Sequence, residues 1–326
     1  MTYIFVSPRT GRIRVGWRVT IFFLLLAIAF GLLGFAAGFV FMVVSRTLPT
    51  DETLREQLGT PGYELILYAL QIAAAVMASA ICLRWLDRRR LGSIGYQRHR
   101  GWGRDLLLGM AVAAGMISLI VVIQVVSGTL TLRVSEALTT RLSHGVWSYA
   151  LIFLIAACFE ELVFRGYPLQ TLLLDVRPGV AIAVPSVIFG LAHLLNPSWS
   201  WLALINTIMA GVWLSVGYYK TRSLWFVTGA HFSWNFTMGT VYGLNVSGLP
   251  DAARVALFTA SHQGPQWITG GDYGPEGGIL ASIILVGATI WLWRANWLRP
   301  APESLEGLTP ASPASAMPVT EEKNNT

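Results

Sequence analysis

Apolar runs about as long as a bilayer is thick recur from the first residues to the last third of the chain. A spanning helix needs about 20 such residues. Runs of this kind place candidate helices at 19–44, 62–83, 105–127, 147–167, 179–195, 199–219, 223–243 and 278–294. The sequence therefore predicts an all-α fold, a polytopic bundle of eight transmembrane helices.

The amino-acid composition also indicates a protein whose surface is largely covered by lipid. Hydrophobic residues make up 54% of the chain and charged residues only 12%, against about 25% charged residues in a typical soluble domain. The first run could be mistaken for a secretory signal, because Arg9, Arg12, Arg14 and Arg18 precede it. However, Thr20 to Val44 is far longer than the roughly 7–15 apolar residues of such a signal, so we interpret it as a retained helix.

Basic residues predict the orientation of the bundle. With the N-terminus in the cytoplasm, the inner segments hold all of the 23 basic residues except Arg46, Arg55, Arg133, Arg141 and Arg254. This asymmetry predicts that both termini are cytoplasmic. Because the charges lie between apolar runs, they indicate juxtamembrane segments and argue against nucleic acid as a partner.

The predicted spans divide the chain into three parts. Residues 1–18 form a cytoplasmic segment and 19–298 form the transmembrane domain. The tail 299–326 is rich in Pro, Ala, Ser and Glu, and we expect it to be disordered because it cannot bury a core. Cys82 and Cys158 lie far apart inside apolar runs, so no disulfide is expected.

A few ionisable or polar groups fall inside the predicted spans, where a charge costs roughly 2.5–3.5 kcal/mol. Arg165 follows Glu161 by four residues, on the same helix face, so the two are predicted to pair. Glu160 points about 100° away and has no local partner. A poorly solvated carboxylate of this kind suits acid–base catalysis, although both Glu residues could instead sit at a hydrated helix end.

Two further helices contribute histidines. His193 could serve only in packing. His231 and Asn235 share one helix face and could form a polar contact between helices. Taken together, the residues form a hydrolytic set: Glu160 takes a proton from water, His193 orients that water, and His231 and Asn235 donate to an oxyanion. Alternatively, Glu160, His193 and His231 could bind Zn²⁺.

Depth along the helices argues against such a site. At about 1.5 Å per residue, Glu160 and His231 lie roughly 10 Å from the inner ends of their helices, whereas His193 lies nearer 20 Å. Straight perpendicular helices would keep these groups apart. Their convergence is therefore a prediction that requires helix tilt, or a helix that starts deeper after the 167–178 connection.

The motifs Glu160-Glu161-x-x-x-Arg165, Phe189-x-x-x-His193 and His231-x-x-x-Asn235 resemble the signature of the CPBP family. This family comprises CAAX-type prenyl endopeptidases and bacteriocin-processing or self-immunity (Abi) proteins. The resemblance covers about residues 145–245. It implies an intramembrane endopeptidase that uses the water-activating and oxyanion-binding residues named above, with Glu161, Arg165 and Phe189 as structural support. Members are commonly labelled metalloproteases, but Asn235 is a poor zinc ligand, so we favour a mechanism without a metal cofactor.

Other functions remain open at this stage. The same groups could form a proton-coupled transporter, or a non-catalytic immunity protein that binds a peptide. The abundance of Arg and the short loops favour a bacterial inner membrane protein, whose substrate would be a peptide or a membrane protein. No sequence feature indicates a particular oligomeric state.

Overall fold

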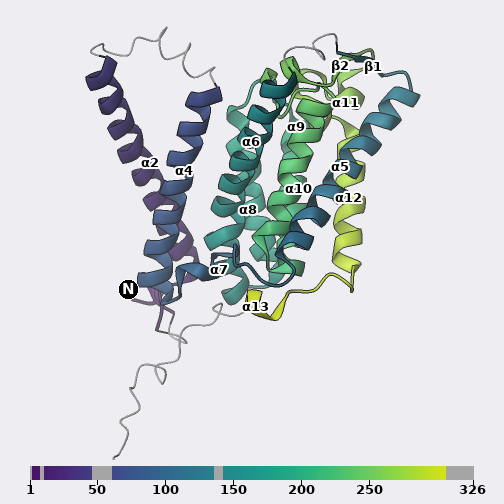
Figure 1. The fold of residues 1–326 in the computed structure, drawn as a ribbon. Coiled ribbons are helices and arrows are strands. Elements are labelled where there is room, and N and C mark those ends of the chain that lie inside the picture. The colour runs from purple at the N-terminus through teal and green to yellow at the C-terminus, as the bar shows by residue number, and fades with distance from the viewer. Residues whose placement is uncertain (1, 8–10, 46–60, 136–141, 306–326) are drawn as a thin grey trace, which may run out of the picture.

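The computed structural model describes residues 2–7, 11–45, 61–135 and 142–305, and the chain is mostly helical (Figure 1). Each of the eight apolar runs contains a helix. The long helices are α2 (Val15–Ser45), α4 (Pro61–Ile81), α5 (Trp102–Val126), α6 (Leu142–Glu161), α8 (Pro178–Ala192), α9 (Trp201–Thr221), α10 (Leu224–Phe236) and α12 (Ile279–Arg294).

Six segments among the described residues are long and apolar enough to cross a membrane. They are Val15–Val40, Leu65–Asp87, Trp102–Val126, Gly145–Asp175, Pro178–Leu195 and Trp201–Thr221. The protein is therefore a multi-pass membrane protein. The last two predicted spans are shorter as regular α-helix: α10 passes into a π-helical turn at Thr237–Val241, and α12 has 16 residues.

Helix α10 lies at the centre of the bundle and packs against α5, α6 and α9. Two glycines allow its close approach to α5. A Cβ atom at Gly229 would lie 2.2 Å from the Leu106 carbonyl oxygen, and one at Gly109 would lie 2.0 Å from that of Phe226. Small residues at such crossings permit backbone contact between helices in a membrane. This packing fixes the helix that bears His231.

Helices α2 and α4 form a pair at one side of the bundle. They meet near the N-terminus, where they join the rest of the structure, and diverge from each other toward the opposite end (Figure 1). At the junction, the buried Arg18 guanidinium pairs with the carboxylates of Asp87 and Asp175. The Phe22 ring stacks on Tyr167, with centroids 5.4 Å apart. These contacts attach α2 to the inner part of the bundle.

The connection expected between residues 167 and 178 is instead largely helical. After α6, a π-helical turn at Leu162–Gly166 leads into α7 (Tyr167–Asp175). The helical path therefore continues about eight residues beyond the predicted end of the span. A turn of this kind is common near functional sites, and here it follows directly after Glu160 and Glu161.

The two ends of the bundle differ. One end, the basic end, carries α1 (Thr2–Phe5), α13 (Pro302–Leu305) and the segment 88–101. The other end, the capped end, carries α11 (Gln266–Thr269) and two strands. The prediction of an all-α fold did not include these strands. Strand β1 (Leu130–Val134) pairs antiparallel with β2 (Phe258–His262), with Leu130 opposite His262. Most of the predicted tail, 306–326, lies outside the described residues.

Candidate active site

Glu161 and Arg165 form the predicted ion pair in the interior of the bundle. Arg165 Nη1 donates to Glu161 Oε1 at 3.0 Å, and both side chains are 0% exposed. Buried charges persist in a fold only when they are paired and hydrogen-bonded. Arg165 meets this condition with its other nitrogens: Nη2 donates to the Gly211 carbonyl at 3.0 Å and Nε to Ser215 Oγ at 3.4 Å.

His231 joins this pair from α10. Its Nδ1 atom lies 2.8 Å from Glu161 Oε1, the same oxygen that accepts from Arg165. A carboxylate in this position accepts the Nδ1 proton and thereby fixes the ring orientation and the tautomer. The opposite nitrogen, Nε2, lies 3.8 Å from Glu160 Oε2. His231 is thus held between two adjacent carboxylates.

Glu160 occupies a different environment from Glu161. Its side chain is 24% exposed, and it lines the large cavity described below. Its Oε2 atom is buried but accepts no hydrogen bond from the described residues. A carboxylate that lines a cavity and has an oxygen without a hydrogen-bond partner has spare capacity to accept a further hydrogen bond.

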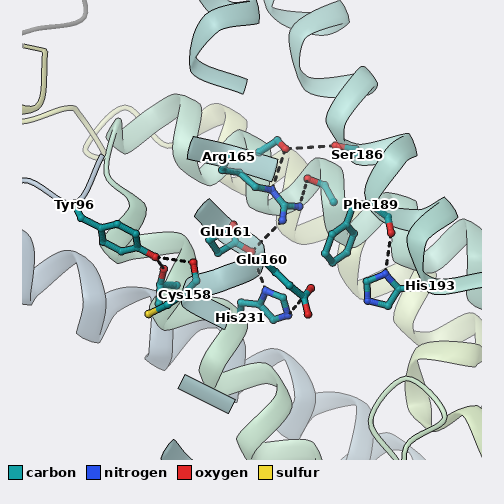
Figure 2. Close-up of polar contacts among 12 residues, drawn as sticks. Tyr96, Cys158, Glu160, Glu161, Arg165, Ser186, Phe189, His193 and His231 are labelled. Atoms are coloured by element: carbon teal, nitrogen blue, oxygen red, sulfur yellow. Dashed lines mark hydrogen bonds and ion pairs between the residues drawn. The ribbon is translucent and has the colours of Figure 1, made fainter. Parts of the chain in front are cut away.

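His193 lies at the C-terminal end of α8. Its Nδ1 atom is 2.8 Å from the Phe189 carbonyl oxygen, so this nitrogen donates its proton to the helix end and Nε2 is left available. The Phe189 ring links the polar groups: it lies 4.5 Å from the His193 ring and 6.1 Å from the His231 ring. The Arg165 guanidinium carbon lies 4.7 Å from the same ring centroid, on its other side (Figure 2). Phe189 therefore positions all three side chains.

A single cavity of about 860 Å³ is lined by Glu160, His193, His231 and Asn235. Figure 2 shows the Glu160 carboxylate and the two histidine rings turned toward a common space. Residues from three separate helices therefore border the same cavity.

Sequence reasoning missed a second acidic group at the cavity. Glu276 lies in the connection before α12, and its Oε1 atom accepts from Trp234 Nε1 at 2.8 Å. Its Oε2 atom accepts from the Ser247 amide at 2.8 Å and from the Ser247 hydroxyl at 2.7 Å. These bonds attach the capped end to α10. Glu276 lies in a Gly-rich loop outside any motif, so the sequence held no signal for it.

The proposed zinc ligands do not form a complete set. Within the described ranges, no three His, Cys, Asp or Glu side chains are grouped closely enough to hold a metal ion. Glu160 and His231 approach one another, whereas His193 contacts the carbonyl and the ring of Phe189. A catalytic zinc site needs three protein ligands, and the described side chains form no such group around Glu160.

The fold and the site define a class: a multi-pass helical membrane protein with a buried carboxylate–histidine cluster at an internal cavity. Residues 140–237 match the family model of Type II CAAX prenyl endopeptidase Rce1-like proteins. This segment contains all the motif residues, so the predicted resemblance is confirmed there, and because this is a protease family the match supports a peptidase. Neither the curated proteins nor the solved structures include a significant match to the chain.

Proposed function

We propose that the protein is an intramembrane endopeptidase that hydrolyses a peptide bond with water activated by Glu160. The observation that carries this proposal is the placement of Glu160: its side chain is 24% exposed and lines the cavity, and its Oε2 atom, which accepts no hydrogen bond from the described residues, lies 3.8 Å from His231 Nε2. A general base must reach the water that it deprotonates. The family match over 140–237 supports the same class of reaction.

In the proposed reaction, Glu160 takes a proton from water while the water oxygen attacks the scissile carbonyl carbon. His193 orients the water through Nε2, because its Nδ1 proton is donated to the Phe189 carbonyl. The C–N bond then breaks, and Glu160 returns the proton to the leaving amine. Glu160 thus acts first as base and then as acid, without net change to the enzyme.

Asn235 and His231 are proposed to stabilise the oxyanion. Both line the cavity, and Asn235 follows His231 by one helical turn. The Asn235 amide can donate directly. His231 can donate through Nε2 when its ring is doubly protonated, because the Nδ1 proton is already given to Glu161. Donors of this kind stabilise the charge that develops in the transition state.

The cavity lining indicates the class of substrate. It is largely aromatic and aliphatic, and none of the described residues that line it is Lys or Arg. It therefore offers no Lys or Arg side chain to a free C-terminal carboxylate. We propose that the substrate is an apolar segment of a membrane-associated peptide or protein, cleaved at an internal bond. We further propose a bacterial inner membrane as the location, on the basis of Arg usage and the short loops.

The test combines activity with metal content. Wild type, Glu160→Gln and a control, Glu303→Gln in α13, are purified in detergent and incubated with a peptide library, with and without a strong chelator. We expect wild type and the control to cleave in both conditions, and Glu160→Gln to bind peptide without cleaving it. Cleavage that chelation abolishes and zinc restores would contradict the metal-free mechanism. Equal activity in Glu160→Gln would contradict the role of Glu160.

A further inference from the structure

We propose that a groove on the outer surface of the bundle, between α8 and α12, binds one anionic phospholipid. In this arrangement the first part of an acyl chain lies in the groove and the phosphate lies beside Arg294. The residues that line the groove do not overlap with those that line the cavity of the candidate active site. The lipid site is therefore independent of the proposed function.

The groove follows from the packing of three helices. Helices α8 and α12 both pack against α9, which lies between them (Figure 1). The space that remains over α9 has a volume of about 500 Å³. Val212 and Val216 line it from α9, and Gly179 and Ala183 line it from α8. A Cβ atom at Gly179 would meet no other atom within 4 Å, so the groove is open on that side.

The middle of the groove offers apolar contacts and no spare hydroxyl. Thr289 is the only hydroxyl residue in its described lining, and Thr289 Oγ1 donates to the Leu285 carbonyl of the same helix at 2.7 Å. Val212, Val216 and Ile290 lie inside regular α-helices, whose backbone groups bond within the helix. A peptide in this groove would leave its own backbone groups unpaired, which is costly in apolar surroundings. A hydrocarbon chain has no such groups and fits the lining better.

Three cations gather around Trp293 at the end of the groove. Arg294 lines the groove and is exposed. Lys220 Nζ donates to the Trp293 carbonyl at 3.3 Å. The Arg222 guanidinium carbon lies 5.3 Å from the Tyr219 ring centroid, and that ring stacks on Trp293 with centroids 5.6 Å apart. In the part of the chain that the structure describes, none of the three cations forms a salt bridge. Their charge is therefore available to an anion.

Exposed tryptophans indicate that this end of the groove lies at the level of the lipid headgroups. Trp291, Trp293 and Trp297 are all about half exposed, and tryptophan is enriched where a membrane meets water. Cations at this level meet lipid phosphates, and the adjoining apolar groove meets the chain of the same molecule. Basic pockets between transmembrane helices bind acidic headgroups in this way. A zwitterionic lipid would bring its own cation close to the three, so the charges favour an anionic lipid.

Native mass spectrometry of the full chain tests the site without any measurement of catalysis. The protein is freed of lipid in detergent and titrated with phosphatidylglycerol, or with phosphatidylcholine of the same acyl chains. The dissociation constant of the first bound lipid is measured for each. One variant, Arg294→Gln with Lys220→Gln, removes charge from the end of the groove. A second variant, Gly179→Leu, fills the groove with a side chain.

Each variant has a matched control. Arg84→Gln with Arg100→Gln removes two exposed arginines from α4 and the segment 88–101. Gly103→Leu adds the same side chain near the start of α5, where a Cβ atom would also meet no atom within 4 Å. The melting temperature of each variant shows whether it is folded. If the charge variant does not fold, the comparison of the two lipids on wild type and the result for Gly179→Leu still decide.

We expect wild type to bind phosphatidylglycerol more tightly than phosphatidylcholine. A basic residue near a lipid surface contributes about fivefold in affinity, so Arg294→Gln with Lys220→Gln should weaken phosphatidylglycerol binding by roughly 25-fold. Gly179→Leu should weaken the binding of both lipids, and both controls should behave as wild type. Equal dissociation constants for the two lipids on wild type would overturn the proposal. Unchanged binding in Gly179→Leu, or an equal loss in the arginine control, would overturn it in favour of general attraction to a basic surface.

Discussion

His231 Nδ1 and Arg165 Nη1 both contact one oxygen of Glu161, at 2.8 and 3.0 Å. Glu161 is therefore the group through which a residue of α10 and a residue of the π-helical turn are held together. The neighbouring Glu160 remains directed at the cavity. Two adjacent carboxylates thus have separate tasks, one structural and one proposed to be chemical.

Replacement of Glu161 or Arg165 by Ala is expected to destabilise the protein by about 3–5 kcal/mol, because each change leaves a buried charge without its partner. The double variant should be little worse than either single variant, since both remove the same interaction. Thermal unfolding in detergent measures these losses. As a control, Arg165→Ala combined with Arg18→Ala, whose salt bridges involve other residues, should give additive losses. Additive losses for Glu161→Ala and Arg165→Ala would show that they are not coupled.

Asn235→Ala is expected to lower kcat by roughly 10²–10³, the usual effect of removing one oxyanion donor. KM should change little, because the donor acts mainly in the transition state. The melting temperature should stay near that of wild type, since Asn235 is half-buried at the cavity. Steady-state kinetics on a cleaved peptide measure this effect. A rise in KM with unchanged kcat would instead assign Asn235 to substrate binding.

The sequence predicted the helices and the pairing of Glu161 with Arg165, because both depend on local features. Apolar runs identify spans by length, and a spacing of four residues places Glu161 beside Arg165. The contact of Glu161 with His231 joins residues from α6 and α10, so only the packing of those helices could reveal it. Likewise, β1 pairs with β2 across more than a hundred residues. Leu130–Val134 does alternate apolar and polar side chains, but the pattern is only five residues long and does not identify its partner.

Because α5 and α10 cross closely, we expect alanine substitutions at two glycines to differ sharply in their effect on stability. Gly229→Ala would place a Cβ atom 2.2 Å from the Leu106 carbonyl oxygen, so the helices must separate. Overpacking of this kind costs typically 1–3 kcal/mol, and the shift of α10 should also reduce turnover. The matched control is Gly115→Ala on α5, where no atom lies within 4 Å. We expect Gly115→Ala to be neutral or stabilising, and equal melting temperatures for the two variants would contradict the crossing.

The lining of the cavity predicts whether a peptide with a free or an amidated C-terminus is the better substrate. The cavity contains the carboxylates of Glu160 and Glu276, and its described lining includes no Lys or Arg. A free carboxylate close to the scissile bond would therefore be repelled by these two carboxylates and would find no Lys or Arg partner there, and desolvation costs several kcal/mol per ion. For peptides that differ only at the C-terminus, the amide should be cleaved with a higher kcat/KM than the acid when the bond lies within a few residues of the end. The difference should vanish when the bond lies ten residues away. A preference for the free acid would instead indicate a cation at the site and cleavage near the terminus.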